Sequence, residues 1–255
     1  MRSLSSQSVR NAAHLAGLAV LLVGLPGCQT ITGVSSSSQV RVIDASPDAP
    51  GLDIYQGGLA MAYNLDFGTV TSYVGVSPGV SSITDDTAGT KQILTTASAT
   101  YAASKQYTVL IGNVVANLQE TVLTDQSLPA PSGEISLRVL DQATRYTGGV
   151  DVYLVPSGTE LSLAAPILTN VLFGSNSGYI NVPAGTYSIV LLPTGTVPVD
   201  ASGTTPATKS IYSGTATAYA VGAARTILLI DNQVLPTPGF QVVVADDYDS
   251  PATAS

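Results

Sequence analysis

Short apolar runs separated by turn residues dominate the pattern along the chain. Segments such as 39–44, 135–140 and 187–192 are rich in Val, Ile, Leu and Tyr, residue types that favour strands. Turn pairs such as Pro78-Gly79 interrupt these runs. Downstream of the N-terminal segment, no window carries an apolar stripe at i, i+3, i+4 and i+7 for more than two helical turns. The pattern therefore predicts an all-β fold, with strands spaced by about 8 to 12 residues as in a β-sandwich.

The same landmarks occur twice, in the same order, and the offset between the copies grows from 97 to 119 residues. Such self-similarity is the signature of an internal duplication. The matched landmarks are Arg41–Asp44 with Arg138–Asp141, Asp53–Tyr55 with Asp151–Tyr153, Phe67-Gly68 with Phe173-Gly174, Tyr73 with Tyr179, Gly79 with Gly185, and the segment ending at Asn113 with the one ending at Asn232. We therefore expect two tandem Ig-like antiparallel β-sandwich domains.

The N-terminal segment has the pattern of a secretory signal. Arg2 and Arg10 precede a mostly apolar run of 14 residues, 12–25, which falls short of the roughly 20 residues that a membrane-spanning helix needs. The string Leu-Pro-Gly-Cys that ends at Cys28 resembles a lipobox. By that resemblance, cleavage precedes Cys28, which then carries a diacylglycerol and an amide-linked acyl chain such as palmitate. Three chains exceed the two signals that stable anchoring needs. A plain signal followed by an unrelated cysteine is the alternative.

The residue after the cysteine bears on location. It is Gln29 and not Asp, which by resemblance to lipoprotein sorting rules favours the outer membrane. The sequence leaves open whether the periplasmic face or the cell surface carries the protein.

These observations predict six segments. A domain of about 100 residues hides roughly 65% of its unfolded surface and can bury its own core. The expected segments are 1–27 as lipoprotein signal peptide, 28–38 as Ser-rich tether, 39–128 as the first β-sandwich, 129–133 as linker, 134–248 as the second β-sandwich and 249–255 as tail.

Charge argues against nucleic acid as a partner. Removal of residues 1–27 leaves seven basic and 17 acidic residues, a net charge of −10. Binding to nucleic acid or to anionic lipid surfaces needs clustered Lys and Arg. The membrane is therefore expected to be reached through the lipid anchor alone.

The sequence offers little catalytic chemistry. The only histidine is His14 and the only cysteine is Cys28, so the two domains contain neither residue type. A Ser-His-Asp triad, a cysteine nucleophile and a typical zinc site each need one of them. A carboxylate pair about 5 to 9.5 Å apart would still serve a glycosidase. We predict no catalytic, cofactor-binding or metal-binding residue.

Three groups of side chains are candidates for ligand contacts. Asp53 and Asp151 occur in both repeats, each two residues before a tyrosine, which favours a structural role, either capping a turn or meeting Arg41 or Arg138. Tyr73 and Tyr179 are interpreted as core or edge residues. The string Asp246, Asp247 and Asp249 could offer oxygens to calcium. It lacks the spaced loop of dedicated calcium sites, so a solvated acidic tail is favoured.

The string RVIDASPDAPGLDIY from Arg41 to Tyr55, the following Phe-Gly and a tyrosine six residues after the Phe resemble the domain-of-unknown-function family DUF4397. The resemblance extends from Gln39 to about Tyr248, twice over. Members of that family usually show His where this chain has Asp44 and Asp141. The family has no established reaction.

Two classes of function remain. The first is a lipid-anchored, non-enzymatic binding or scaffolding protein of the cell envelope, whose strand edges dock a protein partner. The alternative is an anchored, carboxylate-dependent hydrolase of the glycosidase type, which a pair of acids clustered in a cleft would favour.

Overall fold

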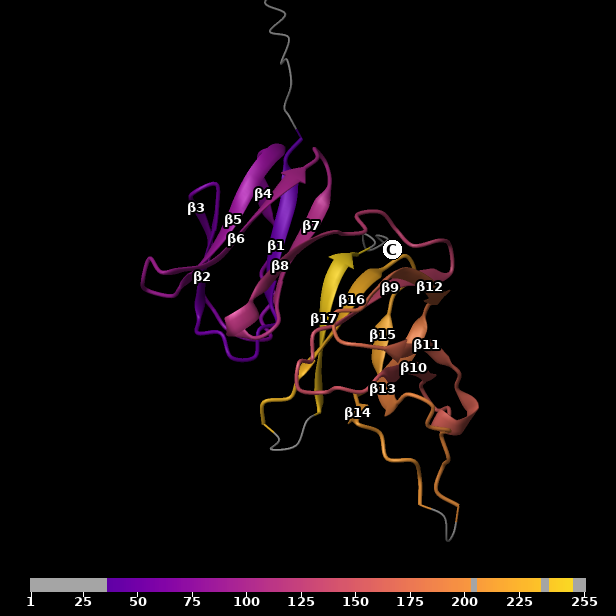
Figure 1. The fold of residues 1–255 in the computed structure, drawn as a ribbon. Helices are drawn as coiled ribbons and strands as arrows, with labels where there is room; N and C mark the ends of the chain where they lie inside the picture. The colour runs from indigo at the N-terminus through magenta and orange to yellow at the C-terminus, as the bar shows by residue number, and fades with distance from the viewer. Residues whose placement is uncertain (1–35, 203–205, 235–238, 250–255) are drawn as a thin grey trace, which may run out of the picture. The chain divides into compact units, whose positions relative to one another are not determined.

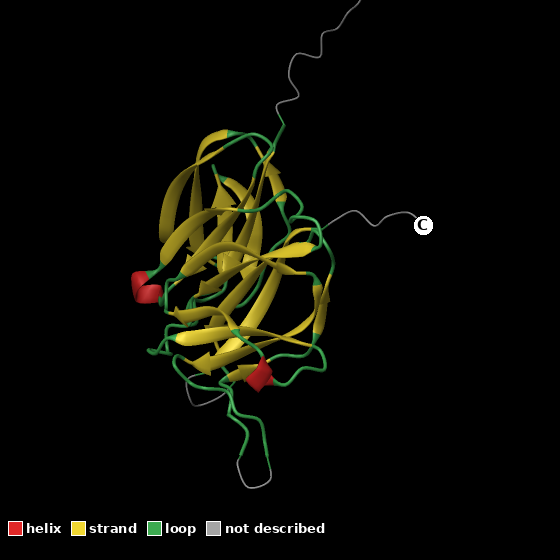
Figure 2. Ribbon diagram, turned by 90° about the vertical axis from the view of Figure 1, so that its right-hand side faces the viewer, coloured by secondary structure: helices red, strands yellow, loops and turns green. Residues whose placement is uncertain are grey.

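Strands form nearly all of the regular structure of the protein (Figure 2). The computed structural model describes residues 36–202, 206–234 and 239–249. Within these ranges the helical segments are two 3₁₀ turns, η1 (Val115–Asn117) and η2 (Leu161–Leu163). No helix of the described ranges is long and apolar enough to cross a membrane. The all-β fold predicted from the sequence is confirmed.

The strands divide between the two repeats (Figure 1). Those of the first repeat are β1 (Ser38–Asp44), β2 (Leu52–Gln56), β3 (Leu59–Leu65), β4 (Val74–Val76), β5 (Gly79–Thr87), β6 (Ile93–Tyr101), β7 (Gln106–Gly112) and β8 (Gln119–Thr124). Those of the second repeat are β9 (Glu134–Asp141), β10 (Val150–Pro156), β11 (Pro166–Val171), β12 (Asn176–Pro183), β13 (Gly185–Pro193), β14 (Tyr212–Ser213), β15 (Thr217–Tyr219), β16 (Ala224–Asp231) and β17 (Phe240–Tyr248).

Each repeat is a sandwich of two sheets, and the strand order is nearly the same in both. The first repeat has the orders β4-β1-β7-β8 and β3-β2-β5-β6. The second has β12-β9-β16-β17 and β11-β10-β13-β14, with β15 also paired to β13. We call β4-β1-β7-β8 and β12-β9-β16-β17 the inner sheets, and the other two the outer sheets. Equivalent strands in equivalent places support the internal duplication.

One pairing in each repeat departs from the expected antiparallel pattern. Strands β1 and β7 run parallel, and so do β9 and β16, whereas the other pairings between these strands and their neighbours are antiparallel. A parallel pair needs a long connection, and here the outer sheet supplies it. The first and last thirds of each repeat therefore meet at the centre of its inner sheet.

The parallel pairing also corrects the sequence alignment. Thr108 lies opposite Arg41, and Thr226 lies opposite Arg138. The two threonines are 118 positions apart, one fewer than the offset of 119 taken from the last motif. Asn113 therefore corresponds to Asp231, and the expected match of Asn113 with Asn232 is wrong.

Two apolar cores fill the two sandwiches. Alternate residues of the inner strands point into them, as the two-residue period of a strand requires. Val40 and Val42 of β1 enter the first core with Ile54 and Ile83 of the outer sheet. The second core is built in the same way from β9, β16 and their outer sheet.

A third core lies between the two inner sheets, which the sequence did not predict. It joins Ile43 and Leu110 of the first repeat to Leu140, Leu228 and Ile230 of the second. Strands β1, β7, β9 and β16 are thus buried on both faces, which explains why each contains consecutive apolar residues instead of a strict alternation. All described residues accordingly belong to one compact unit.

Two buried arginines extend through this third core, and each binds a carboxylate of the other repeat. Arg41 of β1 donates through Nη2 to the carboxylate of Asp247 and through Nη1 to the preceding main-chain carbonyl at 2.8 Å. In return Arg138 of β9 donates through Nη2 to Asp125 at 2.6 Å and through Nη1 to the preceding carbonyl at 3.3 Å. Each repeat therefore supplies the counter-ion for the other repeat's arginine.

Each carboxylate is also held by a threonine and a tyrosine of its own repeat. Asp125 accepts from Thr108 at 2.6 Å and from Tyr73 at 2.7 Å, and Asp247 accepts from Thr226 and Tyr179, both at 2.8 Å. The tyrosine rings lie under the guanidinium groups, at 4.8 Å for Tyr73 and 4.9 Å for Tyr179. We call these eight residues the reciprocal clamp.

Burial and charge act together in the clamp. Burial alone would lower the pKa of Arg41, but Asp247, with Tyr73 and Asp125, raises it. Burial and Asp125 raise the pKa of Tyr73, so its phenol stays protonated and continues to donate. A buried ion pair is strongly destabilising when one partner is removed, because the other charge remains without compensation.

We therefore predict that Asp125→Ala destabilises the full chain by about 3 to 5 kcal/mol, since Arg138 would lose its counter-ion. Urea unfolding followed by circular dichroism measures this change. Asp249→Ala is the control: it removes an exposed partner of Arg225, and exposed pairs contribute roughly 1 kcal/mol or less. Equal effects of the two substitutions would contradict the role given to the clamp.

Candidate functional site

The predicted lipidation site lies outside the described residues. Cys28, the signal segment before it and most of the 28–38 tether precede residue 36, where the described part begins. Lipidation of Cys28 therefore stays a prediction. The described chain starts just before β1, whose first residue, Ser38, is buried.

Asp53 and Asp151 act as turn caps, which is one of the two structural roles predicted for them. The carboxylate of Asp53 accepts from the main-chain N–H groups of Asn64 at 2.9 Å and Gly89 at 3.0 Å. Asp151 repeats the arrangement in the second sandwich, at 2.9 and 3.1 Å. Each aspartate thus ties two turns of its outer sheet together, and neither contacts an arginine of the clamp.

The acidic string near the C-terminus is not a solvated tail throughout. Asp247 is buried in the reciprocal clamp, and only Asp246 and Asp249 are exposed, where both pair with Arg225. The interpretation as a solvated tail is therefore wrong for Asp247. Each carboxylate of the string meets an arginine, and no group of three or more potential metal ligands occurs in the described ranges.

The repeated Phe-Gly motifs form the turns that support Asp44 and Asp141. Gly68 and Gly174 have φ values of 76° and 79°, a region that glycine enters without strain. Their N–H groups donate to the carbonyls of the two aspartates, both at 2.8 Å. Burial raises the pKa of Asp44 to about 7 and that of Asp141 to about 6.

A pair of acids does come together inside the first sandwich. Asp85 of β5 is fully buried beside Glu120 of β8, and burial, then Glu120, raises the pKa of Asp85 to about 8. Burial also raises the pKa of Glu120. Neither residue lines any of the pockets described for this chain. The pair is enclosed by the fold, whereas a glycosidase needs its two acids in an open cleft.

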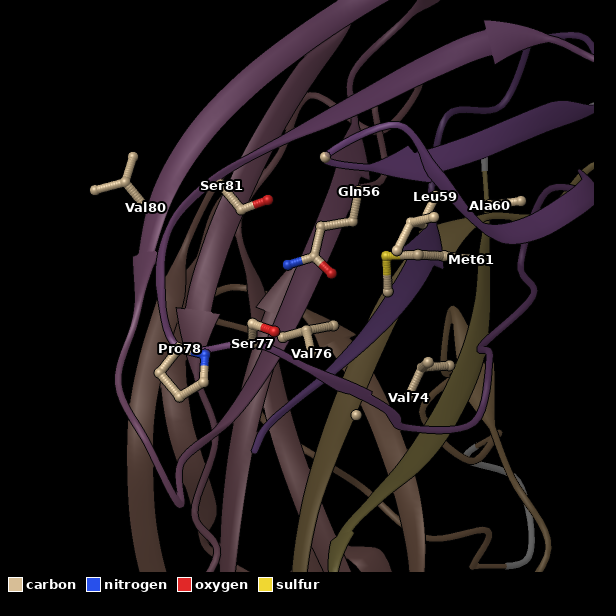
Figure 3. Close-up of a pocket in the computed structure, with 12 residues that line it drawn as sticks. Gln56, Leu59, Ala60, Met61, Val74, Val76, Ser77, Pro78, Val80 and Ser81 are labelled. Atoms are coloured by element: carbon tan, nitrogen blue, oxygen red, sulfur yellow. The ribbon is translucent and has the colours of Figure 1, made fainter. Parts of the chain in front are cut away.

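One concave surface is a groove in the first repeat with a volume of about 390 Å³ (Figure 3). The β2–β3 hairpin lines one side with Gln56, Leu59, Ala60 and Met61, and the segment 74–81, from β4 to the start of β5, lines the other. We call it the edge groove. No charged side chain is among its lining residues.

The edge groove lies between two strands that have a free edge. Strand β3 is the last strand of the outer sheet and β4 the last strand of the inner sheet, and residues of both line the groove. Apolar side chains are exposed here: Leu59 and Val80 are each 78% exposed, and Val74 is 41% exposed. An edge strand with apolar neighbours can pair with another strand, because its outer main-chain N–H and C=O groups are unpaired.

Sequence reasoning missed both the edge groove and the clamp. The groove is assembled from two turns more than ten residues apart, and its residues are ordinary in type. One feature of the sequence did point to the clamp, since Arg41 and Arg138 are charged residues with apolar neighbours on both sides within a strand. A charge at such a position indicates either an exposed face or a buried ion pair.

Residues 38–153 match the family model described as Domain of unknown function (DUF4397), which confirms the resemblance noted from the sequence. The match runs from β1 into β10, so it covers the first repeat, β9 and the first part of β10. The wider resemblance, up to about Tyr248, stays a prediction. Among curated proteins no relative is found.

Two solved structures illustrate the likeness to other proteins. CBMbc (family CBM26) from Eubacterium rectale Amy13K, in complex with maltoheptaose, has 11% identity and a TM-score of 0.24, over 85% of this chain and 98% of that one. A "putative cell adhesion protein" from Bacteroides fragilis NCTC 9343 has 7% identity and a TM-score of 0.20, over 86% and 100%. At these TM-scores neither likeness carries an argument about this chain.

The buried acids predict how stability depends on pH. The pKa of Asp85 rises from near 4 in the unfolded chain to about 8 in the fold, so the folded chain holds this proton more tightly. Stability from this group is present below pH ~4 and is lost as the pH rises toward 8. We expect Asp85→Asn to flatten the fall in urea midpoint between pH 5 and pH 8, because the amide resembles the protonated carboxyl.

The Asp85→Asn variant should keep part of the pH dependence of the urea midpoint, because the pKa of Asp44 is also raised. Glu160→Gln, at an exposed position of the second repeat, is the control and should keep the slope of the unchanged chain. An unchanged slope in Asp85→Asn would show that Asp85 is already ionised in the fold.

Proposed function

We propose that the protein is a lipid-anchored, non-enzymatic binding or scaffolding protein of the cell envelope, and that it holds a protein partner at the edge groove. The observation that carries the proposal is the meeting of two free strand edges, β3 and β4, at one uncharged and partly apolar groove. The occupant we propose is an extended, uncharged segment of the partner.

Strand addition suits this groove physically. A free strand edge offers unpaired main-chain N–H and C=O groups, and an added strand satisfies them whatever its side chains are. Its alternate side chains would then meet Leu59, Met61 and Val76 on the groove wall. Burial of apolar surface contributes about 25 cal/mol per Å², so exposed residues such as Leu59 and Val80 favour a bound partner.

Charge supports an uncharged segment as the occupant. The chain without residues 1–27 has a net charge of −10, which repels polyanions. The groove wall itself offers no charged side chain to a charged ligand. Selection by main-chain pairing and apolar contact therefore fits the groove better than selection by ion pairs.

The position of the groove relative to the tether also supports an envelope partner. Ser38 of β1 pairs with Val76 of β4, and Val76 lines the groove. Nine residues, 29–37, separate Cys28 from β1 and can reach at most about 30 Å at full stretch. With Cys28 lipidated, the groove would lie close to the outer membrane, where anchoring raises the effective concentration of envelope partners.

Photo-cross-linking in cells tests the docking site. A photoreactive residue at Leu59 or Val80 should give a discrete protein adduct, because both positions border the groove and are 78% exposed. Leu163 in the second repeat is the matched control, since it is apolar and 76% exposed but belongs to η2 and does not line the groove.

Adducts at the same yield from all three positions, or from none, would contradict docking at the edge groove. Turnover of a glycoside by the purified chain, abolished by one carboxylate substitution, would instead favour the hydrolase alternative.

The anchor has its own test. Cys28→Ser should move the protein from the membrane fraction to the soluble fraction, because the substituted residue cannot accept a diacylglycerol. Fractionation followed by immunoblotting measures the shift. Retention of the cleaved variant in the membrane fraction, at the level of the unchanged protein, would exclude lipid attachment at Cys28.

A further inference from the structure

The two outer sheets carry different chemistry on their exposed faces, although their strands are equivalent. In the second repeat this face is apolar and closed: Tyr153, Val190 and Leu192 are buried under Leu161 and Ala164. Leu161 belongs to η2, in the connection 157–165 between β10 and β11. The second repeat therefore covers its own outer face.

In the first repeat the same face is open and polar. The equivalents of Tyr153, Val190 and Leu192 are Tyr55, Thr84 and Asp86, because they hold the same positions in the β2–β5 and β10–β13 pairings. Strands β2 and β3 are joined by Gly57 and Gly58 alone, both at positive φ. So short a turn leaves no segment to cover the sheet.

The open face holds a cavity of about 340 Å³, lined by Tyr55, Gly58, Thr84, Asp86, Lys91 and Ile93. The ring of Tyr63 meets that of Tyr55 edge to face, with centroids 6.3 Å apart, and Tyr63 is 69% exposed. One tyrosine ring, that of Tyr55, thus lines the cavity together with a carboxylate and an ammonium group, and Tyr63 extends the aromatic surface beside it. Concave sites with aromatic walls and a few polar groups are typical of ligand sites.

Asp86 has a buried carboxylate oxygen that accepts no hydrogen bond from the described residues. The residue is only 8% exposed, and the oxygen concerned is Oδ1. Its neighbour across the strands, Asp53, has both oxygens occupied by turn amides. No ion pair joins Lys91 to Asp86 in the part of the chain that the structure describes. A buried carboxylate oxygen that accepts no hydrogen bond lowers the stability of the fold. A bound ligand that donates a hydrogen bond to this carboxylate would offset that cost.

We propose that this cavity is a binding site for a neutral saccharide. Its carboxylate can only accept hydrogen bonds and its ammonium can only donate them, whereas each sugar hydroxyl does both. The C–H face of a sugar ring is apolar and fits beside the tyrosine rings. A cation would meet Lys91, and an anion would meet Asp86 on a chain that already carries a net charge of −10 without residues 1–27.

Titration of the full mature chain with maltotetraose, cellotetraose and chitotetraose, followed by NMR and calorimetry, tests the site. At least one sugar should saturate and shift the amides of Gly58, Thr84 and Lys91, with a dissociation constant of about 1 mM or below, as small ligands on open sites allow. Asp86→Asn should weaken binding about tenfold, since a hydrogen bond to a charged acceptor is stronger than one to a neutral amide.

The controls separate binding from folding. Asp86→Asn should keep or raise the urea midpoint, because it removes an unpartnered buried charge, whereas a purely structural Asp86 would lower it. Lys91→Ala should weaken sugar binding, and Lys105→Ala, at an exposed lysine outside the cavity, should not.

No saturation by any of the three sugars up to ~10 mM, in the range of weak single-site binding, would overturn the proposal. Affinity that Asp86→Asn leaves unchanged, or saturable binding of choline in place of a sugar, would overturn it as well. The edge groove plays no part in this experiment, so its outcome is independent of the cross-linking result.

Discussion

The structure depends on a reciprocal exchange of charge between two copies of one domain. Arg41 and Arg138 are buried in a low-dielectric layer, where a lone guanidinium would be very costly. Each finds its carboxylate in the other repeat, and each carboxylate is fixed by a threonine and a tyrosine of its own. The third apolar core surrounds these contacts. Separation of the inner sheets would take Asp247 from Arg41 and Asp125 from Arg138, and would leave Arg41 only its longer contact of 3.9 Å with Asp125 of its own repeat.

The features that the sequence predicted correctly are local. Strand-forming runs, turn residues and the duplicated motifs can be recognised in short windows of sequence, because each depends on a few consecutive residues. The role of Asp53 and Asp151 was also accessible, since a repeated aspartate next to a strand tends to cap a turn. The alignment of the last motif was nevertheless wrong by one residue, because the parallel strand pairing fixes its register and the similarity of the letters does not.

The features that it missed depend on contacts between distant segments. Asp247 is separated from Arg41 by 206 positions, so its string looked like a solvated tail. Phe67 and Phe173 share one motif, yet Phe67 packs on the third core while Phe173 is 42% exposed. The reason is their neighbours: Ile230 approaches Gly68, and the residue equivalent to Ile230 in the first repeat is Gly112, which offers no side chain to pack against.

The reciprocal clamp joins the first strand of the described chain to its last strand. The chain emerges from its N-terminus, so β1 with Arg41 is available long before β17 with Asp247. While only the first repeat has been synthesised, Arg41 and Asp125 lack their hydrogen-bonding partners from the second repeat. Contacts of such high sequence separation slow folding, because the entropy of closing a long loop opposes them. Until the final strand arrives, the inner face of the first repeat is the surface on which a chaperone or a second chain could bind.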